Sequence, residues 1–259
     1  MSVLSGKRAA EAINRRPSSV TYRVCPTSRE EAHENSGTVY VKHTREPLWR
    51  GLTRLEWPQS WRVARLERLM KRAGLSVPRV WLAASRVGRS GVEHVVVLEG
   101  VAGASLREVR QRDGRGAVYE DAIAAAAKAA AKLHDAGFVH GDMVPGNLMF
   151  AEPQNELDAD QGSGVVFIDN DRTRRVYGPW RWRARFRNAA QLSLRLRLLG
   201  RWADARAFLR AYAEVADLSP WQMRSVRKAA VRRSREAFRL EKAQGLRAEM
   251  DGGPAYDGP

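Results

Sequence analysis

The first part of the chain carries short apolar segments that favour strands. Residues 38–42 combine β-branched and aromatic side chains, residues 78–83 have a similar character, and residues 94–98 form the continuous apolar run of a buried strand. Residues 58–72 instead show helical periodicity and are followed by Gly74, a common helix terminator. We expect the inner face of this helix to carry Trp61, Leu66, Leu69 and Ala73.

The second part of the chain changes to a helical pattern. Residues 119–136 are rich in alanine, contain no Gly or Pro, and end before Gly137, which predicts a long helix. Residues 148–150 and 165–168 predict two short strands, and we expect the acidic segment between them to be a flexible hairpin tip. Beyond Pro179 the pattern is helical and basic.

Strands followed by helices predict an α+β fold with two lobes. The glycine-containing segment 100–103 interrupts the pattern and is the expected hinge. We expect a flexible N-terminal arm over residues 1–20 and a small β-rich N-lobe with one helix over residues 21–100. A larger, helical C-lobe is expected over residues 101–250 and a disordered tail over residues 251–259.

Composition narrows the class of protein. The 259 residues are 44% hydrophobic, which is enough for one large domain or two small lobes. Cys25 is the only cysteine, so a disulfide framework within the chain and a cysteine-rich zinc site are excluded. No apolar run approaches the length of a membrane span, and the first 16 residues lack the apolar segment of a secretory signal. We therefore expect a cytoplasmic protein.

The charge is strongly positive and unevenly distributed. Lys and Arg number 45 against 29 Asp and Glu, which gives a net charge of +16. Residues 171–247 alone hold 21 basic and six acidic side chains. Such a field attracts nucleic acid, an anionic membrane face, or a phosphorylated or acidic substrate. Charge alone does not distinguish among these partners.

Three polar residues have the chemistry that phosphoryl transfer needs. An attacking alcohol needs a carboxylate to orient it and accept its proton, and Asp142 is the candidate. A nucleotide triphosphate needs a divalent metal held by hard oxygen ligands. Asn147 follows Asp142 across a Pro-Gly turn, and Asp169 ends a buried apolar strand. We expect the three side chains to meet at one site.

The same residues carry a family resemblance. His140-Gly-Asp142 with Asn147, and then Ile168-Asp169, resembles the catalytic loop and metal-binding Asp of the protein-kinase-like fold. Glycine stands where protein kinases usually have Arg, which is similar to small-molecule kinases. The resemblance implies ATP and Mg²⁺ as cofactors, Asp142 as the catalytic residue, and Asn147 and Asp169 as ligands of the metal and its nucleotide.

The resemblance also assigns residues of the N-lobe. Lys42 closes a predicted strand and is implied to steady the nucleotide phosphates. Its acidic partner would be Glu67, which lies well inside the predicted helix, or alternatively Glu56. It is at least as open that Glu67 is a solvated glutamate on the surface without such a role. The backbones of Glu99 and Val101, at the hinge, would pair with adenine.

Softer matches point to one family within this fold. Residues 72–78, 167–174 and 182–199 resemble segments of the bacterial lipopolysaccharide core kinases, which phosphorylate Kdo or heptose. Two features depart from the kinase pattern. No glycine-rich phosphate loop precedes Lys42, and Tyr40 stands where Ala usually lies beneath adenine. A degenerate kinase fold is therefore an alternative.

The segment after the predicted metal site indicates the kind of acceptor. No peptide-binding platform of the protein-kinase type follows Asp171, which favours a sugar or lipid-like acceptor. Asp171, Arg172, Arg174 and Arg175 are expected to help with the metal or to contact an anionic acceptor. Residues 180–187 alternate Trp or Phe with Arg. They suit a membrane interface, an anionic glycan, RNA, or an amphipathic helix with buried tryptophans.

The resemblance implies an ATP-dependent kinase that phosphorylates a sugar hydroxyl of the lipopolysaccharide inner core, Kdo or heptose, at the inner face of the cytoplasmic membrane. Its partners would be the anionic glycolipid acceptor and the anionic membrane surface; nucleic acid is not expected, since no dedicated nucleic-acid module is recognisable. Two alternatives remain. One is a small-molecule phosphotransferase of the aminoglycoside or choline type, and the other is a non-catalytic kinase-fold scaffold that binds membrane or RNA.

Overall fold

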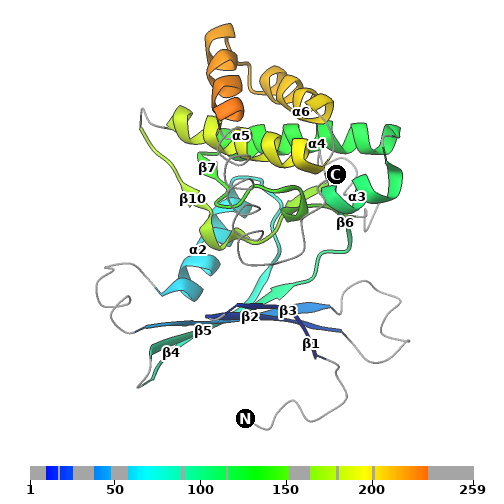
Figure 1. Cartoon of the computed structure of the whole chain (residues 1–259). Coiled ribbons are helices and arrows are strands. Elements are labelled where there is room, and N and C mark those ends of the chain that lie inside the picture. Colours follow the sequence, from blue (N-terminus) through cyan, green and yellow to red (C-terminus); the bar gives the residue numbers. More distant parts are fainter. Residues whose placement is uncertain are drawn as a thin grey trace, which may run out of the picture.

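The protein is built from a β-sheet lobe and a helical lobe, which lie one above the other in Figure 1. The computed structural model describes residues 10–16, 18–25, 38–47, 58–88, 91–114, 116–151, 164–178, 181–199 and 202–232. The N-lobe elements are β1 (Ala10–Arg16), β2 (Ser19–Val24), β3 (Val39–Glu46), α2 (Gln59–Arg72), β4 (Val80–Gly88) and β5 (Gly91–Glu99).

The C-lobe elements follow in the order β6 (Gly103–Ser105), α3 (Leu106–Asp113), α4 (Ala117–Asp135), β7 (Phe138–Val139), η2 (Pro145–Asn147), β8 (Leu148–Ala151), β9 (Val165–Phe167), η4 (Asn170–Arg172), β10 (Arg174–Arg175), α5 (Arg181–Leu199) and α6 (Trp202–Val215). Residues 220–232 form a further helix. Among the helices that the structure describes, none is long and apolar enough to cross a membrane.

The N-lobe sheet is antiparallel, in the order β1-β2-β3-β5-β4. β1 pairs with β2, so residues 10–16 and 19–20 belong to the sheet. The expectation of a flexible arm over residues 1–20 is therefore wrong for these residues, while residues 1–9 lie outside the described part of the chain. The sheet is larger than predicted because the β1–β2 hairpin extends it beyond β3.

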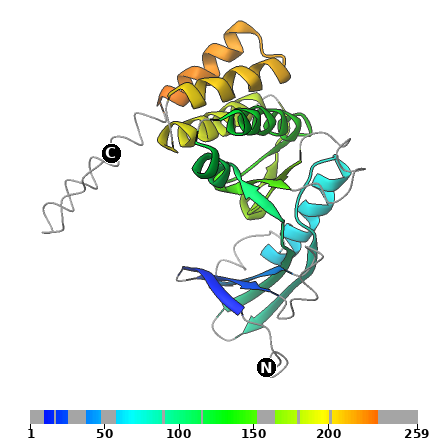
Figure 2. The same ribbon diagram turned by 90° about the vertical axis from the view of Figure 1, so that its right-hand side faces the viewer.

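Helix α2 connects the two lobes. It contacts β4 and β5 of the sheet and η4 of the C-lobe, and Figure 2 shows it (cyan) standing between them. The predicted helix is confirmed, and Leu66 is buried as expected, but Val63 and Met70 are buried beside it whereas Trp61 is 54% exposed. The buried face therefore runs through Val63, Leu66 and Met70, which are spaced three and four residues apart.

The chain leaves the sheet at a close backbone contact. The Gly100 amide donates a hydrogen bond to the Thr38 carbonyl at 2.8 Å. A Cβ atom on Gly100 would lie 2.6 Å from that oxygen, so a side chain does not fit there. The next strand, β6, pairs with β8 in a separate three-stranded sheet. The predicted hinge around residues 100–103 thus coincides with the passage from one sheet to the other.

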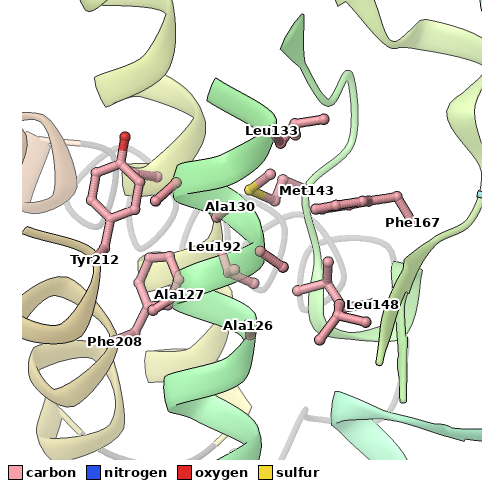
Figure 3. Close-up of a cluster of buried hydrophobic side chains, with 14 of the residues drawn as sticks. Ala126, Ala127, Ala130, Leu133, Met143, Leu148, Phe167, Leu192, Phe208 and Tyr212 are labelled. Carbon is pink, nitrogen blue, oxygen red and sulfur yellow. The ribbon is translucent and has the colours of Figure 1, made fainter. Parts of the chain in front are cut away.

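The largest hydrophobic core surrounds α4 in the C-lobe. Ala126, Ala127 and Ala130 are fully buried, and such small side chains let neighbouring elements approach the helix closely. Figure 3 shows larger side chains on either side of α4, with Phe208 and Tyr212 from α6 on one side and Met143, Leu148 and Phe167 on the other. This core fixes the loop between β7 and β8, because Met143 within that loop is completely buried.

β8 and β9 pair antiparallel, as a hairpin requires, so both predicted strands are confirmed. The expected hairpin tip covers residues 151–164; Ala151 instead ends β8, and its amide donates a hydrogen bond to the Gly164 carbonyl at 2.8 Å. Residues 152–163 lie outside the described residues, as does the predicted tail over residues 251–259. The long alanine-rich helix is also confirmed as α4.

Candidate active site

A cavity of about 340 Å³ lies between the lobes. Its apolar wall is formed by Tyr40, Leu98, Val101, Met149 and Ile168, which suits a flat aromatic base. Its charged end holds Lys42, Asp169 and Asp171. The cavity thus pairs an apolar compartment with a charged one, as a nucleotide site requires. Glu99 and Val101 both line it, at the position from which their backbones were predicted to reach adenine.

Lys42 reaches across the cleft from β3 to two carboxylates of the C-lobe. Its Nζ lies 3.0 Å from Asp169 Oδ1 and also forms a short ion pair with Asp171. Burial acts to lower the pKa of Lys42, but the attraction of Asp171 and then of Asp169 outweighs it, so the pKa is raised. Lys42 is therefore a fixed positive charge in the cavity.

The predicted pairing of Lys42 with Glu67 is wrong in this structure. Glu67 instead forms an ion pair with Lys71, one helical turn further along α2, at 2.8 Å. The partners of Lys42 come from the segment after β9, and Glu56, the alternative, lies outside the described residues. Asp171, expected to help with the metal or to contact an anionic acceptor, lies in the cavity between the lobes beside Lys42.

The backbone of Asp169 adopts an unusual conformation. Its φ and ψ are 53° and 50°, in the left-handed region that non-glycine residues seldom occupy. Such a conformation costs free energy and is found where the surrounding structure enforces it, often at functional sites. Here it turns the chain sharply at the end of the β9 segment and directs the carboxylate toward Lys42.

His140 joins the catalytic loop to the Asp169 segment. The Asp142 amide donates to His140 Nδ1 at 3.2 Å, so the ring proton is on Nε2, which donates to the Ile168 carbonyl at 2.9 Å. The imidazole is buried, and this burial lowers its pKa. The Asp169 and Asp142 carboxylates act to raise the pKa of His140 but do not offset the effect of burial. His140 is thus a neutral residue that holds the two segments together.

Asn147 completes the connection among the three predicted residues. Its Nδ2 donates to the Asp142 carbonyl at 2.9 Å, and its own carbonyl accepts from the Ile168 amide at 3.0 Å. The loop carrying Asp142 and the strand end carrying Asp169 are therefore bonded to each other through Asn147. No hydrogen bond to its side-chain oxygen is found within the described part of the chain, so this oxygen can bind another ligand.

The Asp142 carboxylate is oriented by α5. Gln191 Nε2 donates to Asp142 Oδ1 at 3.1 Å, which leaves Oδ2 to accept a hydrogen bond from a hydroxyl. No sequence pattern pointed to Gln191, because one polar residue on a helical pattern is usually solvated.

A buried network holds the catalytic loop against α4 and α5. Asn188 Nδ2 donates to the His140 carbonyl at 2.7 Å, and Asn188 Oδ1 accepts from the His140 amide at 2.9 Å. The same oxygen accepts from His134 Nε2 at 3.1 Å, so His134 Nδ1 is the acceptor for the Tyr212 hydroxyl at 2.7 Å. Complete burial lowers the pKa of His134 to about 4.

The His134 network predicts acid sensitivity. The pKa of His134 lies below its ordinary 6.5, so its stabilising effect is complete above about pH 6.5 and is lost as pH falls toward 4. Between pH 7 and pH 5 this group alone should lower the free energy of unfolding by about 2 kcal/mol. Chemical denaturation at both pH values, for wild type and His134→Gln, checks this. Equal pH dependence in the two proteins would contradict it.

Gly141 is required by close packing against Arg172. A Cβ atom on Gly141 would lie 2.0 Å from Arg172 Cβ and 2.4 Å from the Arg172 carbonyl oxygen. The loop and η4 therefore touch backbone to backbone at this point, which explains glycine in the His-Gly-Asp sequence. A larger side chain would separate Asp142 from the Asp169 segment.

Gly141→Ala should accordingly damage both stability and activity. Forcing a methyl group into this contact should cost about 1–3 kcal/mol in the free energy of unfolding and slow phosphoryl transfer. Gly146→Ala, in the same loop, is the matched control, because a Cβ there meets nothing within 4 Å. Thermal denaturation and a transfer assay on both variants test the prediction, which fails if they behave alike.

The basic residues after Asp171 separate into two groups. Arg172 and Arg174 line a second cavity of about 550 Å³, beside the loop, together with Arg183 and Arg187 of α5. Arg175, predicted to contact substrate, does not line it; its guanidinium lies over the rings of Phe138 and Tyr177.

The aromatic–basic segment over residues 180–187 is partly described as the start of α5. Phe186 is buried, whereas Trp182 is 36% exposed and packs edge-on against Phe186 and Trp221. The helix is present, but the expectation of buried tryptophans is wrong for Trp182, and Phe186 is buried instead; Trp180 lies outside the described residues.

One wall of the cavity between the lobes was not predicted from the sequence. Ile13, Asn14, Ser19 and Thr21 line it, and all four come from the β1–β2 hairpin. This hairpin precedes β3 and Lys42, where the kinase pattern has a glycine-rich phosphate loop. The β-branched run Val20-Thr-Tyr-Arg-Val24 was a usable strand signal, but the absence of glycine made the region look unrelated to the site.

The side chains present suit a magnesium ion accompanying a nucleotide. Asp169, Asp171 and the free amide oxygen of Asn147 are hard oxygen donors, and Lys42 shows that a cation is stabilised between the two carboxylates. Mg²⁺ is usually bound by one or two carboxylates plus substrate phosphates and water. Within the described residues, no larger group of three or more His, Cys, Asp or Glu side chains gathers as a metal site.

Comparison with known proteins agrees with this geometry. A solved structure described as "WaaP in complex with acyl carrier protein" is similar over 86% of this chain and 89% of that chain, with a TM-score of 0.53 and 20% identity. The predicted α+β kinase-like fold is thereby confirmed. No curated protein sequence matches this chain. Residues 15–212, well over half of the chain, match the sequence model of a family of sugar-lipid kinases. The chain therefore belongs to the Lipopolysaccharide kinase (Kdo/WaaP) family.

Proposed function

We propose that the protein transfers the γ-phosphoryl group of ATP to a sugar hydroxyl of the lipopolysaccharide inner core, on Kdo or heptose. Membership of the family makes the protein a phosphotransferase of the lipopolysaccharide kinase type. The nucleotide, the metal and the choice of acceptor are our proposals.

The observation that carries the proposal is the hydrogen-bonded unit formed by the catalytic loop and the Asp169 segment. Asn147 and His140 bond the two segments together, and Lys42 reaches the same point from the other lobe. The segments that carry a proton acceptor, a phosphate-binding cation and metal-binding oxygens are therefore held together, although they come from three separate parts of the sequence. A structural turn alone would not need Lys42 or the unusual backbone of Asp169.

In the proposed mechanism Asp142 works as the general base. Gln191 fixes one carboxylate oxygen, and the other orients the acceptor hydroxyl and takes its proton as the hydroxyl oxygen attacks the γ-phosphorus. The bond from the γ-phosphorus to the oxygen that bridges it to the β-phosphate breaks, and ADP leaves. Lys42 neutralises charge on the nucleotide phosphates. Asp169, Asp171 and Asn147 would hold Mg²⁺, which supplies charge neutralisation at the β- and γ-phosphates when bound.

The connection after the metal site supports a non-peptide acceptor. Only residues 173–180 separate η4 from α5, which is too short for the substrate platform of a protein kinase. The space beside Asp142 is instead bordered by α5 and its arginines. A sugar with anionic substituents suits this opening.

The test is incubation with labelled ATP and a panel of acceptors, followed by mass spectrometry of the products. The panel holds Kdo–lipid A, heptosylated core and aminoglycosides. We expect label on a Kdo or heptose hydroxyl only. Label on an aminoglycoside would favour the small-molecule phosphotransferase instead. Absence of Mg²⁺-dependent ATP binding in calorimetry would indicate a non-catalytic scaffold.

A further inference from the structure

A basic cleft lies beside the catalytic loop, apart from the nucleotide cavity. Its volume is about 550 Å³. Among the described residues that line it, four are arginines, Arg172, Arg174, Arg183 and Arg187, and none is acidic. The cleft is therefore a region of concentrated positive charge.

The four arginines are held by rigid elements on two sides of the cleft. Arg172 ends η4, with its backbone packed on Gly141, and Arg174 is paired with Val139 in the β10–β7 ladder. Arg183 and Arg187 are one helical turn apart on α5 and share a face of that helix. All four are exposed, so a ligand entering from solvent can reach them.

The cleft lies next to the proposed catalytic carboxylate, because Gly141 and Gln191, the chain neighbour and the hydrogen-bond partner of Asp142, both line it. Gln191 is the next residue along the α5 face that carries Arg183 and Arg187, and it donates to Asp142 Oδ1. Lys42, Asp169 and Asp171 line the other cavity. An acceptor lying in the basic cleft would thus approach Asp142 from the side away from the nucleotide base.

We propose that this cleft binds a phosphate or carboxylate group of the acceptor and thereby selects acceptors that already carry such a group near the reacting hydroxyl. Arginine binds both groups through paired charge-assisted hydrogen bonds. Several arginines around one cleft favour an anion over a neutral sugar. This inference rests on the proposed function, and it adds Arg183 and Arg187 as specificity-determining residues.

The experiment compares Arg183→Gln/Arg187→Gln with a control double variant, Arg195→Gln/Arg206→Gln. The control removes the same charge from exposed positions of α5 and α6 outside the cleft. Steady-state kinetics use Kdo–lipid A, the same acceptor with its carboxylates reduced to alcohols, and the same acceptor with its lipid A phosphates removed. The last two acceptors distinguish a carboxylate from a phosphate as the recognised group.

We expect the cleft variant to raise the acceptor KM roughly 10–100-fold, from the loss of charge-assisted hydrogen bonds, while the KM for ATP stays within about twofold. The effect should disappear with the acceptor that lacks the recognised group. The control variant should resemble wild type. Equal acceptor KM values in the two double variants would overturn the proposal.

A second measurement separates this proposal from the proposed function. Inorganic phosphate is titrated by calorimetry into protein incubated with Mg²⁺ and a non-hydrolysable ATP analogue. Phosphate binding that the cleft variant loses and the control keeps supports the cleft, even if no acceptor in the panel is phosphorylated. No binding to wild type, or equal binding to all three proteins, overturns it.

Discussion

Asp142→Asn should reduce phosphoryl transfer by about 10²–10⁴-fold, because a general base contributes that much to such reactions. The amide has the shape of the carboxylate, and its oxygen can still accept the hydrogen bond from Gln191. The group facing the acceptor becomes a donor, which cannot take the hydroxyl proton. The loss should appear in kcat, with ATP binding unchanged, because Asp142 does not line the nucleotide cavity.

The control for this variant is Asp121→Asn, which removes an exposed carboxylate near the N-terminal end of α4. Both variants should unfold within a few degrees of wild type. Transfer is followed with labelled ATP, and nucleotide affinity by calorimetry. If Asp142→Asn turns over like wild type, Asp142 is not the base and the mechanism proposed above is wrong.

The residues proposed for catalysis could be placed at one site from the sequence because most of them lie close together in it. Asp142 and Asn147 are separated by a short turn, and their hydrogen bond is local. Asp169 follows an apolar strand, whose end position is also local information. The lobes could be predicted for the same reason, since strand and helix patterns occupy successive halves of the chain.

Residues that reach the site from a distance were harder to identify. Gln191 and Asn188 lie on α5, and only the packing of α5 against α4 brings them to the loop. The predicted partner of Lys42 was wrong for the same reason. Glu67 forms its ion pair with Lys71, one helical turn away on α2, and not with Lys42 in the sheet. Side-chain pairing across lobes depends on tertiary geometry, which periodicity does not contain.

The hairpin above the nucleotide cavity was missed for a different reason. The expected feature was a run of glycines, whose backbone can approach phosphates closely. The β1–β2 hairpin covers the cavity with Ile13, Asn14, Ser19 and Thr21 instead. The strands of this hairpin need no positive φ and therefore no glycine. The run of glycines that marks a phosphate loop is thus absent from the sequence, although a hairpin lines the cavity.

Asp169→Asn should also reduce phosphoryl transfer by roughly 10³-fold. The reason is that metal neutralisation of phosphate charge supplies several kcal/mol of transition-state stabilisation. Asn tolerates the left-handed backbone that Asp169 adopts, so the fold of the segment should be preserved. Lys42 keeps its ion pair with Asp171. The pair that is lost, with the more exposed Asp169 carboxylate, contributes at most about 1 kcal/mol. The loss of activity is therefore expected without a comparable loss of stability.

Asp169→Ala separates the chemical role of the carboxylate from its backbone role. Alanine in the left-handed region should lower the free energy of unfolding by about 1 kcal/mol relative to Asp169→Asn, while both variants stay inactive. The discriminating measurement is ATP affinity against magnesium concentration. Wild type should bind ATP more tightly as Mg²⁺ rises, and both variants should show little dependence. A Mg²⁺ dependence like that of wild type in Asp169→Asn would show that the metal is held elsewhere, because the carboxylate at position 169 is the only group that this variant removes.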